Sequence, residues 1–358
     1  MGEKMKRNYG VDIAKIVAMV FVMILHNNGQ GGFLGLEKTV NSHWFTTRSI
    51  ESLAIVAVNI FGIVSGFLMV GKKFKLARVI DLVLTAWFWS VLVLMVLIAF
   101  GFSVTPVDVM RSLMPLSHNA YWYVNAYIGL ALLAPFLNVG IQAVSKKSFK
   151  KILISAYLIS TTVGFFNNFF LARGYSSYWL IVLYLTGAYF RLYGLKSVKA
   201  SQKTVLLWYL IFTFATVGLE TSKTLLSGLS DFLKINITDW SFISYLPITV
   251  VLASISLFIF LVRIDVRNPR LQKIIALFSK LSFGAYLIDT SLFFNYVLRG
   301  SFVSLATKHA TFAGLLVVLG GIVLFIGFSM MELVRQKLFK ILKVDTLIDK
   351  VAMKIEEI

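Results

Sequence analysis

Residues 79–101 read VIDLVLTAWFWSVLVLMVLIAFG and contain a single charged side chain, Asp81. A helix of this length spans the roughly 30 Å of hydrocarbon in a bilayer. Because lipid offers no hydrogen-bond partners, a spanning backbone must pair its own polar groups and is therefore helical. Similar apolar runs occur on both sides of this one. They predict an all-α polytopic transmembrane helical bundle of about ten spans, near residues 10–27, 50–70, 79–101, 121–141, 152–171, 177–194, 204–220, 242–262, 274–298 and 311–334.

The composition of the whole chain agrees with this prediction. Hydrophobic residues make up 58% of the 358 residues and charged residues only 14%, with a mean hydropathy of +0.82. A soluble domain of this length could not cover its surface with so few charges. We see no internal repeat and no linker, so we expect one membrane domain over residues 1–334. An amphipathic cytoplasmic tail, residues 335–358, follows it.

The chain begins with basic residues that lead directly into the first apolar run. Lys4, Lys6 and Arg7 precede it, and Asp12 and Lys15 lie within it. No small-residue cleavage site follows, which argues against a cleavable secretory signal. We therefore interpret this run as the first span.

The distribution of Lys and Arg predicts the orientation. If the N-terminus is cytoplasmic, the inner segments hold 26 of the 35 Lys and Arg residues and the outer segments hold 8, while Lys15 lies within the first span. Such a bias is the signature of cytoplasmic loops. It predicts a multi-pass membrane protein with both termini in the cytoplasm. The net charge of +19 then reflects topology and anionic lipid, and we expect no nucleic-acid partner.

The absence of cysteine excludes several classes of site. The chain cannot form disulfides, thiolate nucleophiles, thiolate metal sites or iron–sulfur clusters. Its four histidines do not have a metal-ligand spacing, so we predict no bound metal.

Three polar residues share one face of the first span. At 100° per residue, Lys15 and His26 lie within ~20° of each other, and Asp12 lies close to the same line. His26 is ~16 Å further along the helix than Lys15, toward the outer side. Asp12 and Lys15 are three residues apart and can pair, or they can reach toward the inner interface. His26 can be a general base, or it can be satisfied by a neighbouring helix.

The second span and its exit carry two further patterns. Asn59, Gly62, Ser65 and Gly66 place small and polar groups on adjoining helix faces, which favours close helix packing. A basic cluster follows at the start of the third span: Lys72, Lys73, Lys75 and Arg78. Cations at a cytoplasmic helix start suit either a phosphate-bearing ligand or lipid headgroups.

Aromatic residues begin the fourth span, where Trp122 and Tyr123 follow Tyr121. Such residues at an outer boundary usually form an interfacial belt, although they can also line a sugar site. These patterns leave two classes open, a membrane-embedded enzyme and a transporter.

Several segments together resemble the integral-membrane acyltransferase family of the acyltransferase-3 type, which includes bacterial polysaccharide O-acyltransferases. The family's first span commonly carries an Asp, a basic residue three positions on and a His eleven further, as Asp12, Lys15 and His26 do. The second span commonly closes on a stretch similar to residues 59–67, NIFGIVSGF.

Further matches follow in the family's order. A basic pair separated by two residues is matched by Lys75 and Arg78, a Trp-Tyr block by residues 122–138, and a late block by residues 281–288, LSFGAYLI. The family often has Arg where Lys15 and Lys75 stand, and lysine lacks the bidentate geometry of arginine. It often has His where Asp289 stands, and an aspartate there can orient an imidazole or pair with a cation.

The resemblance implies a membrane O-acyltransferase that uses acyl-coenzyme A, expected to be acetyl-coenzyme A, as a co-substrate rather than a bound cofactor. The acceptor would be a hydroxyl of a cell-envelope or exopolysaccharide glycan, and the membrane would be a bacterial cell membrane. His26 would be the general base or first acyl acceptor, and Asp12 would hold Lys15. The basic cluster would bind the donor's phosphates. Contacts to substrate would come from Asn59, Trp122 and Tyr123. The alternatives are a glycan transporter or flippase, which should show two similar halves, and a catalytically silent scaffold.

Overall fold

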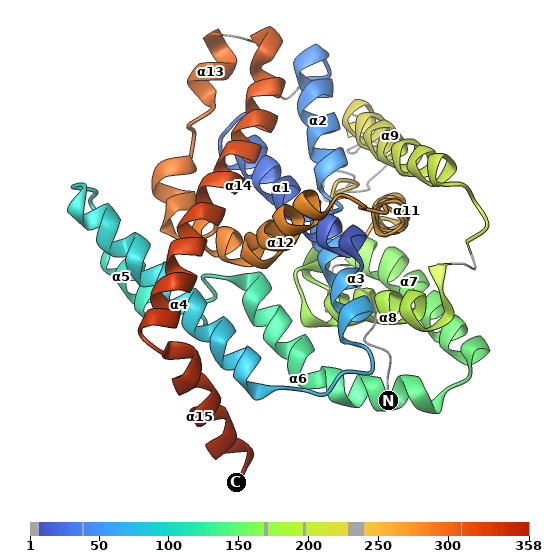
Figure 1. Ribbon diagram of the computed structural model, residues 1–358. Coiled ribbons are helices and arrows are strands. Elements are labelled where there is room, and N and C mark those ends of the chain that lie inside the picture. Colours follow the sequence, from blue (N-terminus) through green and yellow to red (C-terminus); the bar gives the residue numbers. More distant parts are fainter. Residues whose placement is uncertain are drawn as a thin grey trace.

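The computed structural model describes residues 7–37, 39–167, 171–195, 198–227, 240–308 and 310–357. Five basic residues that entered the charge bias, Lys4, Lys6, Lys38, Lys196 and Lys234, lie outside these ranges. The regular elements in the described ranges are all helical, which confirms the all-α prediction (Figure 1). They are α1 (Tyr9–Gly29), α2 (Ser42–Ala54), α3 (Ala57–Met69), α4 (Leu76–Ala99), α5 (Pro106–Leu113), α6 (Trp122–Ala143), α7 (Lys146–Asn167), η1 (Ala172–Gly174), α8 (Ser177–Tyr193), α9 (Gln202–Leu226), α11 (Ile248–Val262), α12 (Pro269–Asp289), η5 (Phe294–Leu298), α13 (Val303–Lys308), α14 (Ala310–Ile341) and α15 (Val344–Glu356).

The number of spans is about seven, and the predicted ten is wrong. Seven stretches of the described chain are long and apolar enough to cross a membrane: Tyr9–Gly29, Ser42–Met69, Leu76–Ala99, Trp122–Ala143, Gln202–Leu226, Pro269–Asp289 and Phe312–Ile341. The apolar runs at 177–194 and 242–262 form α8 and α11, of only 17 and 15 residues. Helices of this size extend about 26 and 23 Å, less than the hydrocarbon thickness. The run at 152–171 belongs to α7, whose first turns carry four lysines.

Helix α1 lies in the middle of the bundle and organises its core. It packs against α3, α11, α12 and α14, and Figure 1 shows it passing behind α12. Its side chains Ala14, Ala18 and Met23 are almost fully buried. A helix surrounded in this way can hold polar groups only where a neighbour provides partners, which restricts where its Asp, Lys and His can lie.

Close packing of α3 against α8 explains the small residues of the second predicted span. A Cβ on Gly66 would lie 1.8 Å from the backbone oxygen of Tyr184, and one on Gly187 would lie 1.9 Å from that of Ile63. Only glycine lets the two backbones approach so closely. The packing interpretation of Gly62 and Gly66 is therefore confirmed.

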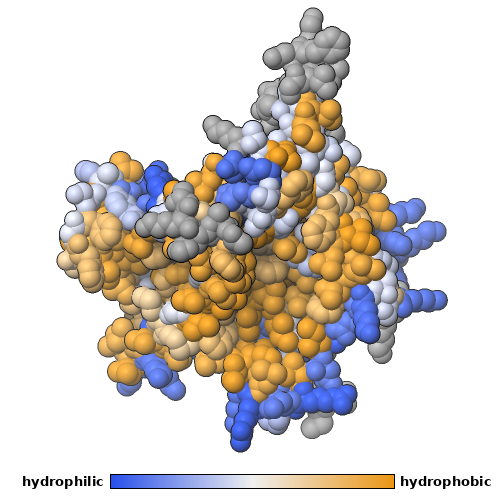
Figure 2. Space-filling view, turned by 90° about the horizontal axis from the view of Figure 1, so that it is seen from above, coloured by the Kyte–Doolittle hydropathy of each residue, from blue (hydrophilic) through white to orange (hydrophobic). Residues whose placement is uncertain are grey.

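The outer surface is broadly apolar. Figure 2 shows hydrophobic residues over most of one face, with hydrophilic residues gathered toward its rim. Large side chains such as Phe136, Val323 and Val334 are among the most exposed. An exposed apolar surface of this extent is expected where lipid replaces water, and the fold is that of a multi-pass membrane protein.

The predicted boundary at residue 334 falls inside α14, which continues to Ile341. Arg335 is buried there and donates to both carboxylate oxygens of Glu332, at 2.6 and 2.8 Å. The indole nitrogen of Trp89 also donates to Glu332, at 2.8 Å. The hydrogen bond from Trp89 thus ties α14 to α4, and α15 follows as a separate helix that packs against α4.

Candidate active site

The three polar residues of the first span all meet α12. Asp12 accepts a hydrogen bond of 2.6 Å from the Ser279 hydroxyl, and Lys15 Nζ donates to the Ser279 backbone oxygen at 2.8 Å. Near the C-terminal end of α1, His26 Nδ1 lies 2.5 Å from Asp289 Oδ2. The predicted shared face is therefore the face of α1 that packs against α12.

Asp12 does not hold Lys15 in the way the sequence suggested. Its carboxylate accepts two hydrogen bonds from Arg7, of 2.7 and 3.1 Å, and forms its ion pair there. Asp12 and Lys15 instead meet at Ser279, which each of them contacts through a different group. These contacts join the N-terminal part of α1 to the middle of α12, and Lys15 lines neither the cavity that His26 faces nor the cationic cavity.

The pair formed by His26 and Asp289 has the geometry of an activated base. Asp289 is fully buried, while the His26 side chain keeps 23% of its surface exposed. If Nδ1–H donates to the carboxylate, Nε2 is left with a free lone pair, as a general base requires. The edge of the imidazole packs against Phe294, with ring centroids 4.8 Å apart. The ring is therefore held from two sides.

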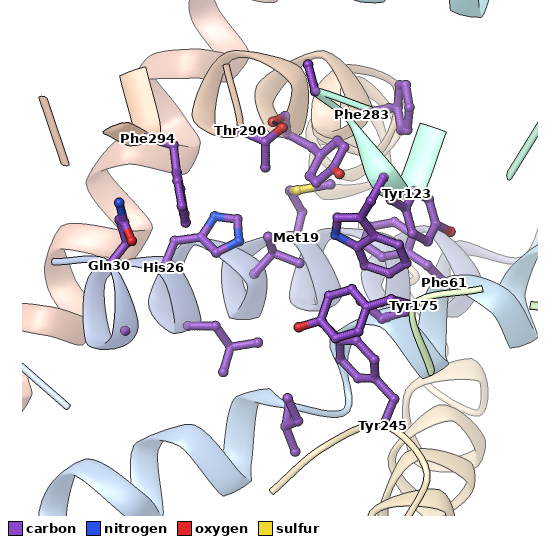
Figure 3. A pocket seen from close by; sticks show the side chains of 18 of the residues that line it. Met19, His26, Gln30, Phe61, Tyr123, Tyr175, Tyr245, Phe283, Thr290 and Phe294 are labelled. Carbon is purple, nitrogen blue, oxygen red and sulfur yellow. Dashed lines mark hydrogen bonds between the residues drawn. The ribbon is translucent and has the colours of Figure 1, made fainter. Parts of the chain in front are cut away.

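His26 faces a cavity of about 480 Å³ (Figure 3). In Figure 3 the imidazole lies on one side of the cavity, and Tyr123, Tyr175 and Tyr245 lie on the other. Trp122 joins this aromatic wall, 4.5 Å from Tyr175 and stacked 6.1 Å from Tyr245 between ring centroids. Flat apolar rings with polar edges suit a sugar, which has apolar faces and a rim of hydroxyls. Trp122 and Tyr123 thus lie on the cavity that His26 faces.

Glu51 is a site residue that the sequence reasoning missed. It lines the same cavity, and its carboxylate accepts a 2.6 Å hydrogen bond from the Asn28 side chain. The signal was present, because Glu51 is an acidic residue inside the predicted second span, where charge is costly and usually functional.

Asn59, a predicted substrate contact, lies outside the lining of this cavity. Its amide donates to the Tyr245 backbone oxygen at 3.0 Å and to the Ser254 hydroxyl at 3.2 Å. Its oxygen accepts from the Trp179 indole at 2.9 Å. Every polar atom of this fully buried side chain is engaged, so Asn59 acts as a structural link behind the aromatic wall.

The four cations predicted to bind phosphate lie around one smaller cavity of about 240 Å³. Lys72, Lys73, Lys75 and Arg78 line it together with Tyr127. Burial lowers the pKa of Lys72, and the nearby Arg78 and Arg191 guanidinium groups lower it further. An anion arriving in this cavity would stabilise the charged form of Lys72.

Two tyrosines connect the cavities. Tyr123 lines the larger cavity and Tyr127, one turn further along α6, lines the cationic one. Their rings are stacked, with centroids 6.2 Å apart. The two cavities are therefore linked, along α6, by a pair of rings in contact with each other.

A family model described as an acyltransferase domain, of the acyltransferase-3 type, matches residues 8–331. That range contains both cavities, the pair of His26 and Asp289, and most of the chain. No curated protein and no solved structure matched the chain. Of the two classes that the sequence left open, the family match supports the membrane-embedded enzyme.

Proposed function

The chain belongs to this acyltransferase family, and from that premise we propose that it transfers an acetyl group from acetyl-coenzyme A to a hydroxyl of an envelope or exopolysaccharide glycan. The observation that carries the proposal is the pair of His26 and Asp289, which opens onto an aromatic cavity one helix turn from a cationic one.

The donor fits the cationic cavity by charge. Coenzyme A carries several phosphate charges, and Lys75 and Arg78 stand at the start of α4 with Lys72 beside them. Charge-assisted bonds from such groups to phosphate are the stronger kind. The thioester lies at the end of a narrow arm, and the stacked pair Tyr123 and Tyr127 gives that arm a short path toward His26.

The acceptor fits the aromatic cavity. His26 Nε2 removes the proton from a sugar hydroxyl as its oxygen attacks the thioester carbonyl. Collapse of the tetrahedral intermediate breaks the carbon–sulfur bond, and the proton held by His26 passes to the departing thiolate. The products are the acylated sugar and free coenzyme A. Asp289 keeps Nδ1 protonated and stabilises the imidazolium formed on the way.

The experiment that tests this function uses the purified full-length protein in detergent or nanodiscs. We expect release of free coenzyme A from acetyl-coenzyme A, stimulated by a de-acylated envelope glycan, and new ester signals in the NMR spectrum of that glycan. The proposal would be contradicted if the protein released no more coenzyme A, and formed no more ester, than a no-protein control.

Removing two cations from the donor cavity should weaken donor binding selectively. In the double variant Lys75→Ala with Arg78→Ala, each lost phosphate contact should cost about 1.5–3 kcal/mol before coupling. The KM for acetyl-coenzyme A should rise strongly, with little change in the KM for the glycan. Lys147→Ala with Lys150→Ala, which removes two exposed lysines of α7, is the matched control. An unchanged donor KM would return Lys75 and Arg78 to the role of topology signals.

We also propose that both termini lie in the cytoplasm, from the excess of basic residues in the segments assigned to that side. Seven crossings would place the two ends on opposite sides of the membrane, so this proposal requires an even number, for example with the shorter apolar helix α11 as an eighth crossing, and the test must read both ends. Fusions of a cytoplasm-active and a periplasm-active reporter at residues 1 and 358 should both report the cytoplasm. A periplasmic signal from either end would show that this topology is wrong.

A further inference from the structure

A second cavity adjoins the one that His26 faces. Its volume is about 330 Å³, and Ala120, Thr290 and Asn295 line both. Two of these residues directly follow residues that contact His26: Thr290 follows Asp289, and Asn295 follows Phe294. A ligand held at His26 can therefore extend into this second cavity.

The second cavity offers donors. Arg111 of α5 contributes a guanidinium group, and His118 and Asn119 lie beside it in the lining. The oxygen of Asn295 already accepts from Gln30 at 3.3 Å and from Arg299 at 3.0 Å, which leaves its NH₂ group to donate.

Asn119 is arranged in the same way, since its oxygen accepts from the Asn125 amide at 3.0 Å. Tyr121 is also one of the lining residues, and it carries a hydroxyl group. It is buried beside Ser90 and has no well-formed hydrogen bond. A buried hydroxyl without a partner, on the wall of a cavity, is a place where a ligand atom is expected.

No carboxylate is present among the described residues that line this cavity. The nearest acid on the same helix as Arg111 is Asp108, one turn earlier. Its carboxylate already accepts hydrogen bonds from Thr105, at 2.6 Å, and from Tyr296, at 2.5 Å. The cavity therefore has a positive charge and several donors, and the acid on the same helix as Arg111 is already engaged.

We propose that this second cavity is a subsite for an oxyanion group, a carboxylate or a phosphate, carried by the acceptor glycan next to the hydroxyl that is acylated. The proposal rests on the proposed function and narrows its substrate class from glycans in general to anionic glycans. Arg111 binds the oxyanion, and the amides of Asn119 and Asn295 with the Tyr121 hydroxyl complete the hydrogen bonding. The subsite sets which hydroxyl is presented to His26.

The test compares charged and neutralised forms of one acceptor. Envelope glycan is taken from the cells that make this protein and is de-acylated with mild base. One portion is then treated to reduce its carboxylates, and another to remove its phosphates. With the wild-type enzyme, loss of the relevant group should lower kcat/KM for the acceptor about 10- to 100-fold, the range expected for charge-assisted hydrogen bonds. The portion that loses activity identifies the oxyanion as carboxylate or phosphate.

The variants locate the effect. Arg111→Ala should lose the preference for charged glycan, and Arg111→Lys should keep part of it. Arg173→Gln, an exposed cation that lines neither cavity, should behave as wild type. Equal use of charged and neutral glycan by wild type, or an unchanged preference in Arg111→Ala, would overturn the subsite while leaving acyl transfer intact.

A binding measurement separates this proposal from the proposed function. The same glycan portions are titrated against the His26→Gln variant in nanodiscs, with and without Arg111→Ala. We expect tighter binding of the charged glycan only when Arg111 is present. This result would stand even if no acyl transfer were found. The subsite would be refuted if the affinity for the glycan changed neither with the charge of the glycan nor with the Arg111→Ala substitution.

Discussion

His26→Gln is expected to lower acyl transfer about 10²–10⁴-fold, the range for loss of a general base. Glutamine keeps a side chain that can donate to Asp289, but it has no nitrogen that accepts a proton at neutral pH. His26 contacts α12 and η5 through its ring edge and one hydrogen bond, so the bundle should insert and fold in the variant. His26→Ala should lose activity to a similar extent.

The measurement is acylation of glycan in cells that contain equal amounts of wild-type and variant protein in the membrane. His43→Gln is the matched control, because His43 is a histidine outside both cavities of the site and its ring nitrogens have no hydrogen-bond partner. It should retain activity near that of wild type. If the His26→Gln protein still acylated the glycan, the imidazole would be a packing group and another base would have to be found.

Asp289→Asn is expected to reduce kcat by a similar order of magnitude. The carboxylate fixes the proton on Nδ1 and stabilises the imidazolium, whereas an amide NH₂ favours the tautomer that carries its proton on Nε2. That tautomer cannot remove a proton from the acceptor. The KM for the donor should change little, because the proposed phosphate contacts lie at the other cavity.

This division between kcat and KM distinguishes an orienting role from a structural one. Asp265→Asn, which removes an exposed carboxylate paired with Arg267, controls for the lost charge. Asp289→Glu keeps the carboxylate on a side chain that is one methylene longer, and it should retain part of the activity. A normal kcat in Asp289→Asn would mean that the contact with His26 serves packing alone.

The sequence predicted the parts of the site that depend on local periodicity. Asp12, Lys15 and His26 share a face because eleven residues are close to three helix turns, and the structure places that face on α12. The basic residues that line the cationic cavity also lie close together in the chain, at 72–78.

What the sequence could not provide depends on tertiary contacts. Asp289 is 263 residues from His26, and no periodicity links the two; only the family resemblance marked Asp289 as a residue that can orient an imidazole. The amide of Asn59 suggested a ligand contact, but its partners on α8, on α11 and before α11 become visible only in the packed bundle. The count of ten spans failed because hydropathy shows that a run is apolar without fixing where its helix begins. Pro247, for example, starts α11 five residues after the apolar run begins.

The link made by Asn59 also bears on the thermodynamics of binding. By joining α3 to α8, to α11 and to the backbone of Tyr245, it sets one side of the aromatic wall before any ligand arrives. Immobilising a side chain on association typically costs about 0.5–1.5 kcal/mol, and a wall that is already rigid avoids much of that loss. A sugar gains little affinity from each contact in water. A preformed aromatic wall would therefore help weak stacking contacts to hold the proposed sugar acceptor.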